Sequence, residues 1–176
     1  NLDMLAKTLI PIDEEIAFIG DYVAIEALRF QGKLQWSIEA SDDIANADIM
    51  IPVMIVQPFV ENAIWHGLLP NNDASKLRVE FILLADESLV VEISDNGAGM
   101  MHKRGDADHV GKGLSLTQER LRLLGSLSGK EIRIEYGVSE PKNKLRPGTL
   151  VRITFPKDFE TAVISADIDE NGSTHQ

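Results

Sequence analysis

The sequence predicts an α+β domain in which helices cover one face of a mixed or largely antiparallel sheet. The predicted elements run helix, strand, helix, hairpin, helix and then two strands. Strands and helices therefore do not alternate strictly, which disfavours a doubly wound parallel sheet. The chain has 176 residues, of which 44% are hydrophobic, and this suffices for one domain with a real core.

The first part of the chain is predicted to form a helix, a strand and a loop. Apolar residues recur at helical spacing over residues 12–30, with acidic residues at 13–15, where the helix dipole favours negative charge. Gln31-Gly32 ends this helix. Residues 34–40 alternate enough to form a strand, and residues 41–48 form an acidic polar loop.

Residues 51–66 are predicted to form the second helix. Pro52 would stand in its first turn, where proline is tolerated. Because a proline inside a helix costs about 3 kcal/mol, we expect a break or a fresh start at Pro58. Gly67 is expected to end the helix, and residues 68–75 to form a loop.

The second half is predicted to contain a hairpin, a mobile glycine-rich loop, a third helix and two more strands, followed by a polar tail. Apolar and charged side chains alternate in the hairpin, and Gly125 closes the helix. The predicted bounds are 77–83 and 89–93 for the hairpin strands, 97–112 for the loop, 114–124 for the helix, 132–136 and 149–155 for the last strands, and 157–176 for the tail.

The composition excludes several functional classes. A net charge of -11 argues against nucleic acid or an anionic membrane surface as the main partner. It still allows an anionic small ligand that local donors and a metal ion can hold. There is no cysteine, hence no disulfide and no cysteine nucleophile. With no apolar run near the roughly 20 residues that span a bilayer and no secretory signal, we expect a cytosolic domain, cut from a longer protein because it begins at Asn1 without Met.

The second predicted helix carries polar side chains suited to chemistry. Glu61, Asn62, Trp65 and His66 share a helical face, while their neighbours can face the core. A carboxylate can orient or deprotonate a water or hydroxyl, and an amide oxygen can ligate Mg²⁺. Taken alone, an ordinary half-polar helix explains the same pattern.

Asp95 stands at the end of a predicted strand and is followed by Gly97 and Gly99. A carboxylate there can accept a hydrogen bond from an exocyclic amine such as that of adenine, and glycines allow close backbone approach to a ligand. An ordinary surface turn is the alternative, since Asp-Asn-Gly is also common turn chemistry.

Gly111-Lys112-Gly113 precedes the helix predicted from Leu114, and a helix N-terminus behind glycines is a ready phosphate site. A plain loop-to-helix junction is the alternative. Two other nucleotide motifs fail. His102 occupies the position where a dinucleotide fingerprint needs glycine, and Gly113 stands where a P-loop needs Ser or Thr.

Taken in order, these pieces resemble the GHKL ATP-binding domains, which share the Bergerat fold, a two-layer α/β sandwich. The matching segments are Glu61-Asn62 for the N box, Asp95-x-Gly97-x-Gly99 for the G1 box, Gly111-x-Gly113-Leu114 for the G2 box, and Gly148-Thr149 for the final adenine-site element. Four motifs in the right order carry the resemblance, where each alone is weak.

Further segments narrow the resemblance to LytS-type sensor histidine kinases over roughly residues 10–156. These segments are Ile12 to Ile16, Tyr22 with Glu26 and Arg29-Phe30, Ile51-Pro52, Gln57-Pro58, Glu61 to Ile64, His66-Gly67 and Glu119 to Leu121. The resemblance implies an ATP-binding histidine kinase domain over 11–156, with 1–10 as the end of an upstream helix.

The resemblance also implies a role for each matching residue. Asp95 binds the adenine amine, Thr149 supports the same edge, Asn62 ligates Mg²⁺, and Glu61 acts near the γ-phosphate as base or water-orienting group. The remaining ATP contacts implied are His66, Gly97, Gly99, Met100, Gly111, Lys112, Gly113 and Leu114, with residues 100–112 as a lid.

The sequence departs from the family in places. Trp65 stands where relatives often have lysine, Lys112 replaces a common apolar residue, and Leu116 replaces a usual Asn. None of the four histidines has the His-Phe context of the phosphoacceptor, so we expect the acceptor on an upstream helix outside this chain.

The resemblance therefore implies the ATP-binding domain of a dimeric, membrane-attached sensor kinase of the bacterial inner membrane, which phosphorylates that upstream histidine and passes the phosphate to a response regulator. Two alternatives stay open. One is a GHKL ATPase in which Glu61 activates water, and the other is a degenerate module that binds a partner and no nucleotide.

Overall fold

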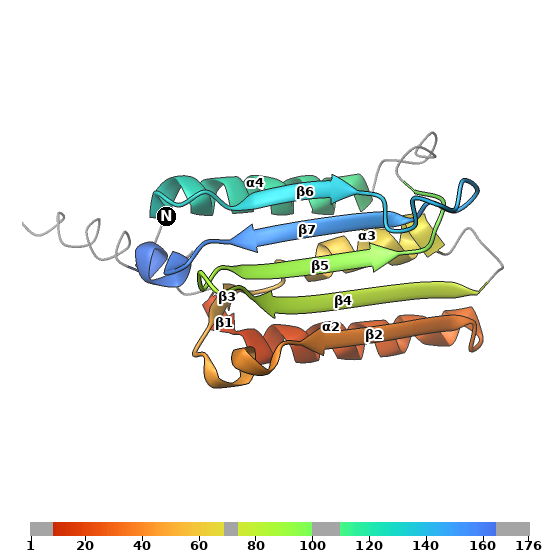
Figure 1. Cartoon of the computed structure of the whole chain (residues 1–176), viewed down its shortest axis with the longest axis horizontal. Coiled ribbons are helices and arrows are strands. Elements are labelled where there is room, and N and C mark those ends of the chain that lie inside the picture. The colour runs from red at the N-terminus through yellow and green to blue at the C-terminus, as the bar shows by residue number, and fades with distance from the viewer. Residues whose placement is uncertain (1–8, 69–73, 100–109, 165–176) are drawn as a thin grey trace, which may run out of the picture.

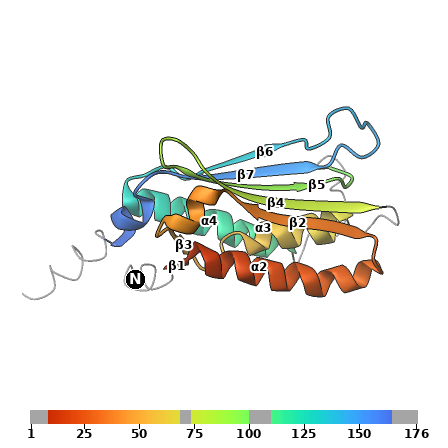
Figure 2. The same ribbon diagram turned by 60° about the horizontal axis from the view of Figure 1, so that its bottom comes forward.

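The computed structural model describes residues 9–68, 74–99 and 110–164. A five-stranded sheet forms one layer and three helices form the other, so the predicted fold class is confirmed (Figure 1, Figure 2). The strands follow the order β2-β4-β5-β7-β6. Their bounds are β2 Leu34–Ala40, β4 Ser75–Leu83, β5 Leu89–Asp95, β6 Arg133–Gly137 and β7 Thr149–Phe155. The sheet is mixed because β2 and β4 are parallel, whereas the other neighbouring pairs are antiparallel.

The helical layer consists of α2 Ile12–Ala27, α3 Gln57–Asn62 and α4 Val110–Ser128, with α3 between the other two (Figure 1). The 3-10 turns η1 Leu28–Phe30 and η2 Asp42–Asn46 follow α2 and β2. Strand β4 shows why the helices cover one face only. Leu77 and Val79 are buried, whereas Lys76 and Arg78 between them are exposed. The alternation expected for a half-buried strand therefore places one apolar face against the helices.

The opposite face of the sheet is polar and carries ion pairs. Arg78 pairs with Glu39 of β2 and with Glu80 of its own strand, and Arg152 of β7 pairs with Glu92 of β5. Strand partners of opposite charge allow this face to stay in water while the other face forms the core.

The predicted helix over residues 51–66 is wrong in its first part. Met50–Pro52 form strand β3, which pairs antiparallel with β1, Leu9–Pro11. The helix starts at Gln57, so that Pro58 falls in its first turn, where its missing amide hydrogen costs nothing. A π-helical segment, η3 Ala63–Leu68, then continues through Gly67.

A buried carboxylate holds the chain between β3 and α3. The side chain of Glu15, 1% exposed, accepts hydrogen bonds from the amides of Met54 at 2.8 Å and Val56 at 3.0 Å. Met54 has a left-handed φ of 54°. This turn cannot continue as a helix, which is why α3 begins only after Val56. On α4, Arg120 donates to the carbonyl of Val53 at 2.7 Å.

Helix α4 is longer at both ends than predicted. It begins at Val110 rather than Leu114, and it passes through Gly125 to Ser128. The amide of Lys130 donates to the carbonyl of Gly125, and Gly129 has φ +64°. This is the hydrogen bond of a Schellman motif, in which Gly129, not Gly125, ends the helix.

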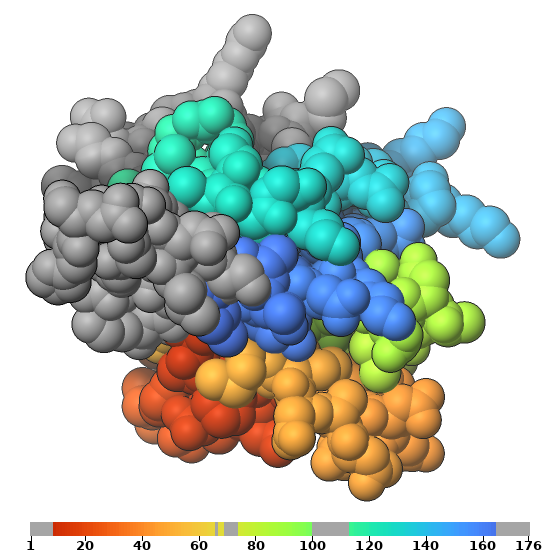
Figure 3. All heavy atoms as spheres, turned by 90° about the vertical axis from the view of Figure 1, so that its left-hand side faces the viewer, coloured from red at the N-terminus to blue at the C-terminus, as the bar shows by residue number. Residues whose placement is uncertain are grey.

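The ends of the described chain also differ from expectation. Leu9 and Ile10 lie in β1 rather than in a helix, and residues 1–8 lie outside the described part. Where the sequence predicts a polar tail, residues 159–164 form a helical turn whose Phe159 and Val163 are buried in the core. Figure 3 shows these blue residues between the teal end of α4 and the orange and red N-terminal elements. Among the described helices, none combines the length and apolar character needed to cross a membrane.

Candidate functional site

Asp95, the last residue of β5, is enclosed by main-chain groups although it stands at the end of a strand. Its side chain is 5% exposed, and one oxygen accepts the amide hydrogen of Gly97 at 2.8 Å. Gly67 of η3 lies directly against the carboxylate, because a Cβ at Gly67 would be 2.9 Å from Oδ1. The position of the carboxylate is therefore fixed by backbone atoms on more than one side.

Glycines make this close packing possible. A Cβ at Gly97 would meet the carbonyl oxygen of Gly67 at 2.0 Å, and one at Gly148 would meet the carbonyl oxygen of Asp95 at 2.1 Å. The amide of Gly148 donates to the carbonyl of Gly97 at 3.0 Å. Gly99, with φ +78°, packs against Pro147. The G1 glycines therefore join three chain segments around Asp95.

Thr149 is the cross-strand neighbour of Asp95 in the β5–β7 pair. Directly opposed residues of an antiparallel pair point to the same face of the sheet, so the threonine hydroxyl and the carboxylate share one face. The family resemblance implies that the two serve one edge of a ligand, and the fold places them opposite one another.

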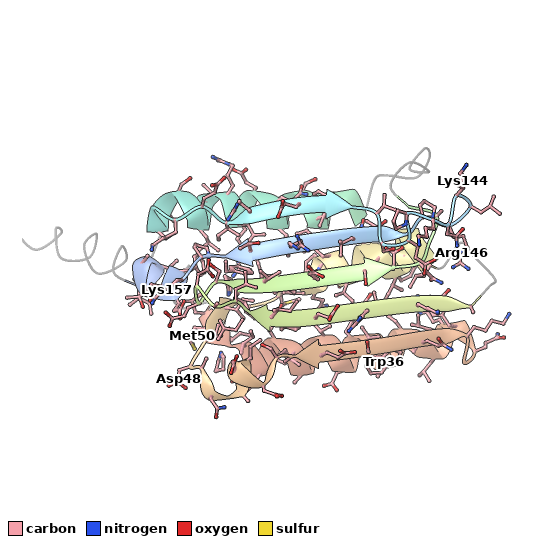
Figure 4. All side chains as sticks on the ribbon, viewed as in Figure 1. Trp36, Asp48, Met50, Lys144, Arg146 and Lys157 are labelled. Carbon is pink, nitrogen blue, oxygen red and sulfur yellow. The ribbon has the colours of Figure 1, made fainter. Side chains whose placement is uncertain are left out.

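Ser139, in the loop between β6 and β7, belongs to the same frame and was missed from the sequence. Its hydroxyl donates to the carbonyl of Asp95. The loop is further tied down by Arg146, whose guanidinium donates to the Asn96 side chain and the Ala74 carbonyl, both at 3.4 Å. Figure 4 shows Arg146 at this end of the sheet. A serine in a Pro- and Lys-rich loop gives no sequence signal, because its partner is a distant carbonyl.

The polar residues of the N box lie at the end of α3. Glu61 and Asn62 are half-buried, and the Glu61 carboxylate accepts from Gln57 Nε2 at 2.9 Å. Only the backbone of His66 is described, within η3. The π-helical segment η3 follows and places Gly67 against Asp95. This contact connects the N box to the G1 box.

Trp65 points toward α2. Its indole Nε1 donates to the hydroxyl of Tyr22 at 3.3 Å, and the guanidinium of Arg29 lies 4.9 Å from its ring centroid. Burial raises the pKa of Tyr22, the hydrogen bond from Trp65 opposes this, and the charges of Glu26 and Glu61 raise it further. Tyr22 therefore lies within electrostatic reach of the Glu61 carboxylate.

The G2 box differs from its prediction, because Gly111, Lys112 and Gly113 lie inside the first turn of α4 rather than before it. The first four amides of a helix have no intrahelical partner, so the amides of these residues can donate to an anion. Of Gly111 and Lys112 only the backbone is described. Leu114 packs against the core.

The lid predicted over residues 100–112 is only partly visible. Met100 and the rest of 100–109 lie outside the described residues, and 110–112 are helical. The expected contact from Met100 therefore stays a prediction.

The residues present fit an oxygen-preferring cation that is shared with phosphates. Within the described ranges no group of three or more His, Cys, Asp or Glu side chains forms a metal site by itself. Mg²⁺ commonly takes one or two protein oxygens and completes its shell with substrate phosphates and water. Asn62 and the neighbouring Glu61 supply oxygens of that kind.

A groove of about 390 Å³ lies on the polar face of the sheet, at the end where Asp95 stands. Its lining includes Asp95 and Ser139 together with Lys76, Ser94 and Asn96, but neither Glu61 nor Asn62. The groove therefore borders the frame around Asp95 and is separate from the N box.

Comparison with known proteins agrees with these motifs. No family model matches the chain. The chain is 31% identical over 163 residues to the sensor protein LytS of Bacillus subtilis, covering 89% of this chain and 26% of LytS. It is 36% identical over 96 residues to the sensor protein kinase HptS of Staphylococcus aureus, covering 54% of this chain and 17% of HptS.

Two solved structures share the fold. The histidine kinase domain of the blue-light activated kinase of Erythrobacter litoralis EL346 superposes with a TM-score of 0.54 at 20% identity, over 88% of this chain and 65% of that one. The mycobacterial sensor histidine kinase MprB gives a TM-score of 0.58 at 14% identity, over 84% and 95%.

The chain is a GHKL domain of the LytS type. This GHKL domain spans about a quarter of the length of LytS and less of HptS, so it corresponds to one part of such sensor kinases. The order of the N, G1 and G2 boxes and the mixed sheet below three helices agree with that assignment.

Proposed function

We propose that this GHKL domain binds Mg-ATP and donates the γ-phosphate to a histidine on an upstream dimerisation helix. The frame around Asp95 carries the proposal. The buried carboxylate of Asp95 accepts the amide hydrogen of Gly97 and packs against Gly67. Its cross-strand neighbour Thr149 lies on the same face of the sheet. This arrangement suits recognition of an adenine amine by Asp95 and support of the same edge by Thr149.

The phosphate end would lie over the end of α3, with the start of α4 beside it. Asn62 would hold Mg²⁺, which supplies charge neutralisation to the phosphates when bound. The amides of Gly111, Lys112 and Gly113 in the first turn of α4 would donate to phosphate oxygens. Phosphoryl transfer depends mainly on positioning and electrostatic stabilisation, and these groups supply both.

Glu61 would act beside the γ-phosphate, where a carboxylate can accept a proton or orient the nucleophile. Its hydrogen bond from Gln57 fixes the carboxylate on the helix surface. His66 and Met100 remain proposed contacts to the nucleotide.

The parent protein would be a dimeric sensor kinase attached to the bacterial inner membrane, with this domain in the cytoplasm. After autophosphorylation of the upstream histidine, the phosphate would pass to an aspartate of a response regulator. The four histidines of this chain lack the acceptor context, so the isolated domain is expected to bind ATP without phosphorylating itself.

The decisive experiment is calorimetric titration of a non-hydrolysable ATP analogue into the domain, with and without Mg²⁺. We expect binding that Mg²⁺ strengthens and that Asp95→Asn weakens at least tenfold (about 1.4 kcal/mol), because the amide would present a donor to the adenine amine. Asp86→Asn, in the β4–β5 turn, is the matched control and should bind as the wild type does. Absence of binding in a folded sample overturns the proposal.

A further inference from the structure

A positively charged side chain is fixed beside the N box from a different helix. Arg29, in the turn after α2, holds its guanidinium over Trp65, and its Nε lies 3.4 Å from Glu26 Oε2. The Arg29 side chain is 52% exposed, whereas that of Glu26 is 8% exposed. Trp65 is fixed in turn by its hydrogen bond to Tyr22. The guanidinium is therefore held in one place while it still faces solvent.

This place borders the Glu61 carboxylate. Trp65 follows Glu61 by four residues and Asn62 by three, which puts the three side chains on adjacent parts of one helical surface. The hydroxyl of Tyr22 feels the charges of Glu26, Glu61 and Arg29 together. Arg29 and Glu61 consequently face the same space at the junction of α2 and α3.

The Arg29 guanidinium has one charged neighbour of its own. Its Nε lies 3.4 Å from Glu26 Oε2, and this oxygen makes no hydrogen bond within the described residues. Among the described residues, no hydrogen-bond acceptor lies against the Nη groups of Arg29. Arg120 is not available as an alternative, because its guanidinium is committed to Val53.

We propose that Arg29 binds the terminal phosphate of ATP, with Trp65 as the platform that positions it. The proposal rests on the proposed function, since it assumes that the phosphates lie near Asn62 and Glu61. A guanidinium offers a planar pair of donors that matches a phosphate, and stacking on an aromatic ring limits the entropy lost on binding. The positive charge at this end of the N-box helix is thus supplied from η1, the turn after α2, and Trp65 positions it.

The test compares affinities for a Mg-bound non-hydrolysable ATP analogue and for Mg-ADP. We expect Arg29→Gln to weaken the analogue about ten- to hundredfold, as loss of a charge-assisted hydrogen bond does, and to change ADP affinity less than twofold. Arg122→Gln is the matched control, because Arg122 is also exposed and also pairs with a glutamate three residues earlier. It should change neither affinity.

If Arg29→Gln weakens the binding of both nucleotides equally, or of neither, the inference is overturned, whereas the proposed nucleotide site is not. If the wild type binds neither nucleotide, it is the proposed function that fails. Should Arg29→Gln fold poorly by thermal unfolding, Arg29→Lys keeps the charge without the planar fork and should retain an intermediate preference for the triphosphate. Preference equal to that of the wild type contradicts a bidentate contact.

The platform role of Trp65 has its own readout. Trp65→Phe keeps an aromatic face and should preserve most of the preference for triphosphate over diphosphate, whereas Trp65→Ala should lose it. If Phe and Ala behave alike, Trp65 does not position Arg29.

Discussion

Gly67 packs directly on the carboxylate of Asp95, with room for a hydrogen atom and not for a methyl group. A Cβ at Gly67 would stand 2.9 Å from Oδ1 and 3.0 Å from Cγ. The two residues are 28 positions apart (95 − 67) and belong to different layers. The contact joins the end of the N-box helix to the end of the central strand.

Gly67→Ala should therefore displace the Asp95 side chain. If Asp95 is the acceptor for the adenine amine, as proposed, binding of the ATP analogue should weaken about tenfold. Calorimetric titration measures it. Gly20→Ala is the control, since a Cβ there would make an ordinary 3.9 Å contact with Ile38. Unchanged affinity in Gly67→Ala would mean that the carboxylate position does not govern recognition.

Glu15→Gln should destabilise the domain by about 1–3 kcal/mol, because an amide has one acceptor oxygen for the two buried amides of Met54 and Val56. Urea unfolding followed by circular dichroism gives the free energy. Glu14→Gln, one residue earlier on the exposed side of α2, should be nearly neutral. Similar effects of both substitutions would contradict the structural role of Glu15.

Two glycines of α4 should respond to alanine in opposite directions. Gly113→Ala fills open space and should stabilise by about 0.5–1 kcal/mol through helix propensity. Gly125→Ala should destabilise by about 1–3 kcal/mol, because its Cβ would stand 2.9 Å from the carbonyl oxygen of Lys130. Midpoints of thermal unfolding compare the pair. If Gly125→Ala stabilises the domain instead, the Schellman turn can shift to accommodate the added Cβ at little cost in free energy.

Phe159→Ala should cost about 3–5 kcal/mol, as for other buried aromatic residues. The ring of Phe159 lies 5.6 Å from that of Phe155 and closes the core beyond the last strand. Denaturant titration measures the loss, and the exposed Lys157→Ala should change stability little. A small effect at Phe159 would place the end of the folded domain at Phe155.

The sequence predicts the sheet and the glycine-containing turn after Asp95 well, because both depend on local patterns. Alternation over β4 and β5 and the Asp95-x-Gly97-x-Gly99 spacing need no knowledge of distant residues. The start of α3 could not be read in this way. It depends on Glu15, whose side chain binds amides 39 and 41 residues later.

A usable signal for Glu15 did exist. Glu15 and Glu26 fall on the apolar face of the helix that begins at Ile12, and an acid in that position predicts a buried partner. Gly125 was misassigned as a helix end for a different reason. In the sequence, a glycine that is required for close packing against the Lys130 carbonyl cannot be distinguished from a glycine that ends a helix.

The carboxylate of Glu15 also affects how the helical layer opens. One side chain of α2 binds the turn before α3, and Arg120 of α4 binds the same turn from the other side. Burial lowers the pKa of Arg120, and the charge of Glu15 opposes this, so the two groups are electrostatically connected. Separation of α2 or of α4 from this turn would therefore leave buried polar groups without their hydrogen-bond partners. The amide hydrogens of Met54 and Val56, although they belong to a turn, should exchange with solvent deuterium as slowly as those of the central strand.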